Sequence, residues 1–202
     1  STLTICDMEL KDTQLKELKE ALPNCIIFSD ETKSEAVDIT LGGKTFRSDV
    51  TELDLSGCGI NDLSSLSVCT KLTKLDLSNN FIKDISPLVD IPGLVTLDLS
   101  DNYISDIRPL MGLTSLTELK LGSNEISSLT ALSELTQLKT LQLEKNKLSD
   151  ISPLGKLANL KNLDLSDNEE LTRKAVDELQ KKLLRYCREN RSCAAASVQE
   201  SA

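Results

Sequence analysis

One feature limits what this chain can fold into more than any other, namely an eleven-residue pattern that returns six times. The copies start 22 residues apart and cover residues 50–170. They read VTELDLSGCGI, LTKLDLSNNFI, LVTLDLSDNYI, LTELKLGSNEI, LKTLQLEKNKL and LKNLDLSDNEE. A fixed period of this length is typical of solenoids, because each repeat buries its apolar face only against its neighbours. The sequence therefore predicts a stack of similar coils.

The apolar residues within each repeat predict how a coil is built. If the first residue of a copy is position 0, apolar side chains recur at positions 0, 3, 5, 10, 13, 16 and 19. In the second copy they are Leu72, Leu75, Leu77, Ile82, Ile85, Leu88 and Ile91. The alternation at positions 3 and 5 predicts a short strand with two inward side chains. Aliphatic side chains of uniform size suit a layered core, and the chain is 39% hydrophobic but only 2% aromatic.

The pattern L-x-x-L-x-L-x-x-N-x-I/L, continued by segments such as KDISPLVDIPG, resembles the leucine-rich-repeat family over residues 50–171. The repeats are similar to the 22-residue class found in bacterial internalins and in regulatory subunits of protein phosphatase 1, and the chain also resembles secreted Firmicutes modules. The resemblance implies an α/β solenoid, a right-handed horseshoe with a concave parallel sheet and 3-10 turns on its convex side. It also implies helix-containing caps at both ends and the binding of a protein on the concave face.

Both ends of the chain depart from the 22-residue pattern, and we expect them to cap the stack because a terminal coil would otherwise expose its leucines. Residues 1–49 are predicted as an N-terminal capping region with a strand, a helix over residues 12–22 and an irregular strand-and-turn insertion. Five full repeats and a partial sixth fill residues 50–171. A capping helix is expected over residues 172–187, followed by a flexible tail over residues 188–202.

Position 8 carries a side-chain amide in five of the six copies. The chain leaves the strand at this point, and an amide can satisfy the backbone groups that become buried there. The same slot holds a cysteine in the first copy. We interpret these residues as a structural ladder, formed by Cys58, Asn80, Asn102, Asn124, Asn146 and Asn168.

The six cysteines do not predict a disulfide framework. Cys25 and Cys69 fall at core positions and Cys6 on the predicted concave face, whereas Cys187 and Cys193 lie in the terminal helix and tail. No C-x-x-C pair occurs, so the spacing indicates no zinc site. Buried thiols suit both a reducing compartment and the surface of an anaerobe. The location therefore stays open between the exterior or surface of a bacterium and the cytoplasm.

The composition argues against several functions. The chain has 32 acidic and 23 basic residues, a net charge of −9, which should repel nucleic acid. It has no histidine, which excludes Ser-His and Cys-His nucleophile pairs and histidine-bound metal. No Gly-rich phosphate loop and no membrane-length apolar run occurs. We therefore expect no enzymatic activity, no cofactor, no metal and no membrane insertion.

The outward positions 2 and 4 of the predicted strands form the first part of a candidate binding surface. Position 4 is acidic in the first three copies, Asp54, Asp76 and Asp98, which we name the acidic column. Such a column would steer a basic partner toward the sheet. The alternative is that these aspartates only keep the sheet soluble. The charged neighbours assigned to the same candidate site are Lys74, Glu118 and Lys120.

Two aromatic residues form the second part of the candidate binding surface. Phe81 and Tyr103 both occupy position 9, one coil apart. Glu125, Lys147 and Glu169 hold this position in later copies, so the scaffold does not require a ring there. Two rings beside an acidic column would make a hot spot for a protein partner. The alternative is that the rings pack only on each other.

The leading hypothesis is a monomeric, non-enzymatic scaffold that binds a protein partner, with a basic surface, through the concave sheet and the adjoining position-9 edge. One alternative is an intracellular regulatory or adaptor subunit that positions an enzyme such as a phosphatase. Another is a structural spacer within a larger surface protein. The residues do not name the partner.

Overall fold

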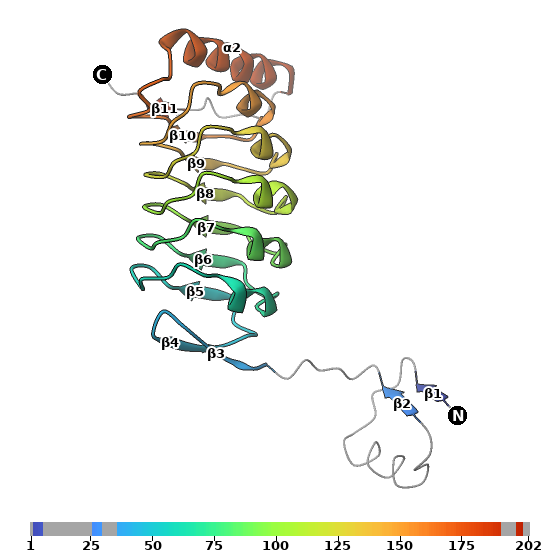
Figure 1. Ribbon diagram of the computed structural model, residues 1–202. Helices are drawn as coiled ribbons and strands as arrows, with labels where there is room; N and C mark the ends of the chain where they lie inside the picture. The colour runs from blue at the N-terminus through green and yellow to red at the C-terminus, as the bar shows by residue number, and fades with distance from the viewer. Residues whose placement is uncertain (1, 6–25, 30–35, 191–196, 200–202) are drawn as a thin grey trace. The chain divides into compact units, whose positions relative to one another are not determined.

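The computed structural model describes residues 2–5, 26–29, 36–190 and 197–199. The chain divides into two compact units, Ser1–Ala36 and Val37–Ala202. In the first unit, strand β1 (Thr2–Ile5) pairs in parallel with β2 (Ile26–Ser29) (Figure 1). The helix expected over residues 12–22 lies outside the described residues.

The second unit is a solenoid of stacked coils (Figure 1). Each coil contributes one three-residue strand to a parallel sheet, and neighbouring strands pair at a register of 22 residues, as Leu75 does with Leu97. The strands of the repeats are β5 (Glu52–Asp54), β6 (Lys74–Asp76), β7 (Thr96–Asp98), β8 (Glu118–Lys120), β9 (Thr140–Gln142) and β10 (Asn162–Asp164). The predicted solenoid with a parallel sheet is confirmed.

Five short 3-10 helices form the side of the solenoid opposite the sheet. They are η1 (Ser64–Val68), η2 (Ser86–Asp90), η3 (Arg108–Gly112), η4 (Thr130–Glu134) and η5 (Ser152–Lys156). A proline stands in the first turn of η2, η3 and η5, where its fixed φ favours a helical start and its missing N–H is not needed. This agrees with the convex 3-10 turns expected from the resemblance.

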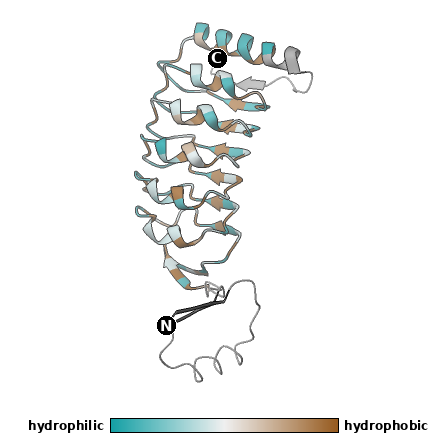
Figure 2. Cartoon of the chain, turned by 90° about the vertical axis from the view of Figure 1, so that its right-hand side faces the viewer, coloured by the Kyte–Doolittle hydropathy of each residue, from teal (hydrophilic) through white to brown (hydrophobic). Residues whose placement is uncertain are grey.

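The core runs through the middle of every coil, between strand and 3-10 helix. Leu72, Leu77 and Ile82 are fully buried, and so are the residues 22 positions further along the chain. Figure 2 shows hydrophobic and hydrophilic residues alternating along the coils. Full burial of one such side chain contributes about 1.5–3 kcal/mol. Each added coil therefore lengthens the same apolar column, as the repeat pattern predicts.

The chain leaves each strand through a residue with positive φ at position 7. These residues are Gly57, Asn79, Asp101, Ser123, Lys145 and Asp167, with φ between 53° and 61°. Gly, Asn and Asp tolerate this left-handed region well. Serine and lysine do not favour it, so the neighbouring coils must impose it on Ser123 and Lys145. The resulting turn brings the position-8 side chain under the sheet edge.

A hairpin covers the start of the solenoid. Strands β3 (Asp38–Leu41) and β4 (Lys44–Arg47) pair antiparallel across Gly42 and Gly43. Both glycines have positive φ, 57° and 76°, as a type I′ turn requires. Ile39 belongs to the buried core. The irregular insertion expected before residue 50 therefore contains a regular hairpin that closes the first coil.

Helix α2 (Arg173–Asn190) covers the other end and packs on η5. Of the side chains described in this helix, those of Val176, Leu179 and Leu183 are buried. Strand β11 (Ser197–Gln199) pairs in parallel with β10 and becomes the seventh strand of the sheet.

The C-terminal end differs in two places from what the sequence led us to expect. The helix continues to Asn190, beyond the predicted end at residue 187, and residues 197–199 form a strand within the predicted tail. Three residues are too short to show periodicity. The pairing arises because the open edge of β10 presents backbone groups that any extended segment can satisfy.

Candidate functional site

The position-8 asparagines lie at the boundary between the sheet and the following turn, and they join consecutive coils. The Oδ1 atom of Asn124 accepts a hydrogen bond of 2.9 Å from the N–H of Ile104 in the preceding coil. Its Nδ2 donates to the carbonyls of Leu99 and Leu121, at 2.9 and 3.1 Å. The same bonds recur at the other four asparagines, all of which are at most 8% exposed. These side chains therefore serve the scaffold.

Cys58 fills the ladder position of the first coil. Its Sγ donates to the carbonyl of Ser56 at 3.4 Å, as Nδ2 of Asn80 donates to that of Ser78 at 3.1 Å. Cys69 is buried, and burial raises the pKa of its thiol. Both cysteines are free thiols. The side chains of the other four cysteines lie outside what the structure describes.

The acidic column has a structural role of its own. Oδ1 of Asp54 accepts from the N–H and the Oγ of Ser56, at 2.9 and 2.7 Å, and Asp76 accepts the same pair from Ser78. These hydrogen bonds hold the pKa of Asp54 below its usual range. The carboxylate thus closes the turn after the strand, which explains an aspartate followed two residues later by serine.

Lysines of the chain itself compensate both ends of the acidic column. Lys120 Nζ lies 3.1 Å from Oδ2 of Asp98 and 3.9 Å from Glu118, and the hydrogen bond to Asp98 raises the pKa of Lys120. At the other end, Lys44 Nζ lies 3.9 Å from Oδ1 of Asp54. Among the described residues, Asp76 between them has no ion-pair partner. The position-2 residue Lys74 pairs with Glu52, at 3.8 Å, rather than with an aspartate of the column.

Phe81 and Tyr103 meet as a stacked ring pair on the edge of the solenoid that adjoins the sheet. Their ring centroids lie 6.3 Å apart and their planes differ by 11°. Phe81 is 56% exposed and Tyr103 48%, so stacking covers only part of each ring. Both backbone N–H groups donate to the preceding coil, to Ile60 and Ile82. The rings are therefore held on rigid backbone while much of their apolar surface faces solvent.

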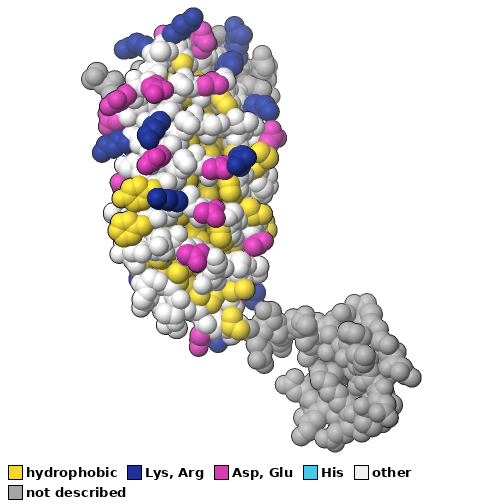
Figure 3. All heavy atoms as spheres, in the orientation of Figure 1, with side chains coloured by type: hydrophobic (Ala, Val, Ile, Leu, Met, Phe, Trp, Pro, Cys, Tyr) yellow, Lys and Arg dark blue, Asp and Glu magenta, His cyan; other side chains and the backbone are white. Residues whose placement is uncertain are grey.

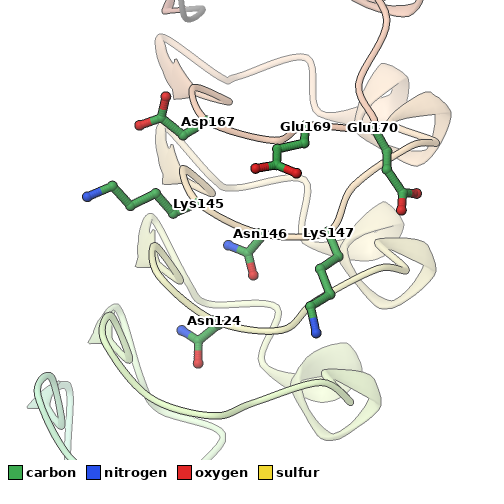
Figure 4. A pocket seen from close by; sticks show the side chains of 7 residues that line it. All are labelled: Asn124, Lys145, Asn146, Lys147, Asp167, Glu169 and Glu170. Carbon is green, nitrogen blue, oxygen red and sulfur yellow. The ribbon is translucent and has the colours of Figure 1, made fainter.

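A polar hollow of about 600 Å³ continues the same edge toward the C-terminus. It is lined by Asn124, Lys145, Asn146, Lys147, Asp167, Glu169 and Glu170 (Figure 4). Figure 4 shows Lys145 and Asp167 on one side of the hollow and Lys147 on the other. Lys147 pairs with Glu125 at 3.3 Å. Its wall thus carries both charge signs, two lysines and three acidic residues.

A second set of aspartates, at position 12, was not singled out from the sequence. Asp62, Asp84, Asp106 and Asp150 each accept from the N–H of the residue two positions later, at 2.8–2.9 Å, where the 3-10 helices begin. The recurrence of Asp at one position was the signal available. Hydrogen bonds from Ser86 lower the pKa of Asp84, although Asp106 and Asp62 oppose this through repulsion. Acidic, basic and hydrophobic side chains are interspersed on the face seen in Figure 3.

The carboxylate of Glu144, on the sheet side, lies in an unfavourable environment for a charge. The Oε2 atom of Glu144 is buried and makes no hydrogen bond to any described residue. Burial raises the pKa of Glu144, and the nearby Asp164 adds to the effect. Gly122 in the preceding coil makes room for it, because a Cβ there would collide with the Glu144 carboxylate. Position 6 is serine in the other four repeats.

Neither a metal centre nor a membrane span is found in the described part of the chain. No group of three histidine, cysteine, aspartate or glutamate side chains lies close enough to hold a metal ion within residues 36–190 and the other described segments. No helix described is long and apolar enough to cross a bilayer. The features that remain are a rigid sheet face, an exposed ring pair and clustered charge.

Comparisons with known proteins agree with this geometry. The family model described as "Leucine Rich repeats (2 copies)" matches residues 49–90 and 136–181, and the one described as "Leucine rich repeat" matches residues 70–126 and 92–148. Together they span the whole of the repeat region. No curated protein is a significant match to the sequence. The chain belongs to the leucine-rich-repeat family.

Within that family, solved structures of bacterial internalins are similar to it. Internalin C2 of Listeria monocytogenes is 34% identical with a TM-score of 0.65, over 75% of this chain and 62% of that one. An internalin, InlF, of the same organism is 31% identical with a TM-score of 0.61, over 77% and 44%. The chain therefore spans less than two thirds of either relative and is internalin-like in its repeats.

A more distant similarity is to a plant receptor. The leucine-rich-repeat ectodomain of the Arabidopsis thaliana membrane receptor kinase GASSHO1/SCHENGEN3 is 29% identical with a TM-score of 0.53, over 58% of this chain and 16% of that one. That ectodomain was solved in complex with CASPARIAN STRIP INTEGRITY FACTOR 2. These neighbours make protein–protein interaction the general role of the fold.

Proposed function

We propose that this protein is a non-enzymatic interaction module that binds a protein partner with a basic surface. The partner contacts the sheet face along the acidic column and the adjoining position-9 edge. The observation that carries the proposal is the ring pair. Phe81 and Tyr103 are about half exposed, and the three later coils carry charged residues at the same position. Exposed aromatic anchors on rigid backbone contribute a large share of the energy of protein interfaces.

Charge supports the choice of a basic partner. Residues 50–115, which form the first three coils, contain nine acidic and four basic residues. Asp76, at the centre of the acidic column, has no ion-pair partner among the described residues, whereas Asp98 is already paired with Lys120. Complementary charge speeds association and makes it sensitive to salt. We therefore expect the association rate to fall as ionic strength rises.

The binding test compares two double variants with the unchanged protein. The protein is immobilised, bound proteins are captured and identified, and the affinity of a purified partner is measured for each variant. Phe81→Ala with Tyr103→Ala should weaken binding at least tenfold, because hot-spot truncation commonly costs 1–2 kcal/mol or more (about 2 kcal/mol for the pair). Unchanged affinity would show that the ring pair is not the anchor.

The matched control is Val89→Ala with Met111→Ala. These side chains lie on η2 and η3 of the same two coils and are 55% and 48% exposed, close to the values of the two rings. The control should leave affinity unchanged. A structural spacer would instead capture no partner at all, and a subunit that positions an enzyme would capture one whose activity changes on binding.

A further inference from the structure

The position-9 stripe has an empty place in the first coil. Coils two and three carry Phe81 and Tyr103 there, whereas the first coil carries Gly59. A Cβ built on Gly59 would have a single neighbour within 4 Å, the Cε2 atom of Phe81 at 4.0 Å. A side chain at position 59 would therefore touch the phenyl ring, and apart from the two adjacent residues nothing else lies within 4 Å of its Cβ.

Phe81 presents a ring surface to this space. Tyr103 stacks against the ring from the next coil, with planes only 11° apart. Successive coils repeat at about 4.8 Å along the sheet, so the next place in the stack lies over Gly59. Because Phe81 is still 56% exposed after stacking on Tyr103, a planar group from outside can cover it there.

An aspartate follows Gly59 within one turn of the chain. Asp62 follows Gly59 by three residues, so their Cα atoms are at most about 10 Å apart. The Oδ1 atom of Asp62 accepts from the N–H and Oγ of Ser64, and these bonds lower the pKa of Asp62. Within the described part of the chain, Asp62 has no ion-pair partner. A basic residue, Lys83, follows Phe81 by two positions and opposes a bound cation.

We propose that the open face of Phe81 above Gly59 is a subsite for an arginine side chain of the partner. A guanidinium group is planar and cationic, so it stacks on a ring and donates to a carboxylate at the same time. A lysine side chain is cationic but has no planar group to stack, and an aromatic side chain is planar but carries no positive charge. The inference rests on the proposed function and specifies the chemistry of its anchor.

The test uses two blocked tripeptides, acetyl-Gly-Arg-Gly-amide and acetyl-Gly-Lys-Gly-amide, titrated into the full chain. The chain has three phenylalanines and two tyrosines, so ring proton resonances are few and can be assigned. The Phe81 resonances should shift with the arginine peptide and approach saturation at a concentration at least threefold lower than with the lysine peptide. Unmoved Phe81 resonances, or equal responses to both peptides, would overturn the subsite.

Three substitutions locate the response. Gly59→Asn should reduce the Phe81 shift by more than half, since asparagine fills the space and tolerates positive φ. Asp62→Asn should weaken the arginine response and keep the acceptor for Ser64, and Asp150→Asn, at the same position of the fifth coil, should not. Lys83→Gln should strengthen it. A full arginine response in both Gly59→Asn and Asp62→Asn would contradict the proposal. If Gly59→Asn does not fold, the comparison of Asp62→Asn with its control Asp150→Asn decides the question.

This experiment separates the subsite from the proposed function. A captured partner that depends on Phe81 and Tyr103 but binds Gly59→Asn with unchanged affinity would overturn the arginine subsite alone. A captured partner whose affinity is unchanged by Phe81→Ala with Tyr103→Ala would overturn the proposed anchor, independently of the peptide titrations.

Discussion

Single residues join the coils of this solenoid through hydrogen bonds to backbone groups that would otherwise be buried without partners. The asparagine at position 8 is the clearest case, since one amide serves its own coil and the preceding one. The sequence is sufficient to recognise this role, because the same residue type recurs every 22 positions where the strand ends. The positions of the ladder could therefore be predicted without the side-chain geometry.

Asn124→Leu tests the ladder. Leucine has a similar volume but leaves the N–H of Ile104 without its acceptor. It also removes one of the two amides that donate to the carbonyl of Leu99, which keeps only that of Asn102. An unsatisfied buried polar group costs about 1–3 kcal/mol, so we expect a loss of about 2–3 kcal/mol in the free energy of unfolding, measured by urea denaturation. Asn61→Leu, at an exposed position, is the control and should stay within about 0.5 kcal/mol. Equal effects of the two would argue against the ladder.

Glu144→Gln should stabilise the protein at neutral pH. Burial raises the pKa of Glu144 in the folded chain, so this group favours folding when protonated and loses that contribution as pH rises through its folded pKa. The variant removes the charge and should gain about 1 kcal/mol at pH 7. The gain should shrink toward pH 4, where the native carboxyl is protonated. Thermal melts at both pH values check this, and a gain that grows on acidification would contradict it.

Interactions between side chains of different coils could not be predicted at the residue scale. Periodicity places Lys120 and Asp98 at the same position of neighbouring coils but does not tell which way a lysine turns. The burial of Glu144 depends on the missing side chain of Gly122, one coil earlier. Both arrangements depend on rotamers, which the repeat pattern leaves free.

Among the elements, the terminal helix and hairpin differ most from the 22-residue pattern. The C-terminal helix follows from the spacing of its apolar residues, and α2 does bury Val176, Leu179 and Leu183. From the sequence, the N-terminal hairpin was predicted only as part of an irregular strand-and-turn insertion. Its contribution arises from long-range packing, since Leu41 and Phe46 pack against the core of the first coil.

Substitutions of the two hairpin glycines separate turn strain from packing. Gly42→Ala and Gly43→Ala both place a side chain at positive φ, which costs about 1–2 kcal/mol. A Cβ on Gly42 would also lie 2.5 Å from Cβ of Cys58, whereas one on Gly43 meets nothing within 4 Å. Gly42→Ala should therefore destabilise the protein by about 1–3 kcal/mol more than Gly43→Ala. Equal losses in chemical denaturation would show that the hairpin does not seal the first coil.

Across the repeat region, each surface of the solenoid carries different chemistry. The sheet face holds the acidic column and its compensating lysines, one edge holds the stacked rings and the polar hollow, and the 3-10 side exposes Val89 and Met111. The fold was predictable because every coil contacts only its neighbours, so the period determines the architecture. The identity of the partner was not predictable from the period, because binding depends on the few positions where repeats differ.

Hydroxyl-radical footprinting of the complex tests most directly whether the ring-bearing edge is the binding surface. Rings and thioethers at the surface oxidise readily, and oxidation at each residue is quantified by mass spectrometry with and without the captured partner. Phe81 and Tyr103 should be protected by the partner, and Met111, 48% exposed on η3, should oxidise equally in both states. Protection of Met111 with unchanged oxidation of the two rings would place the partner on the other side and contradict the account.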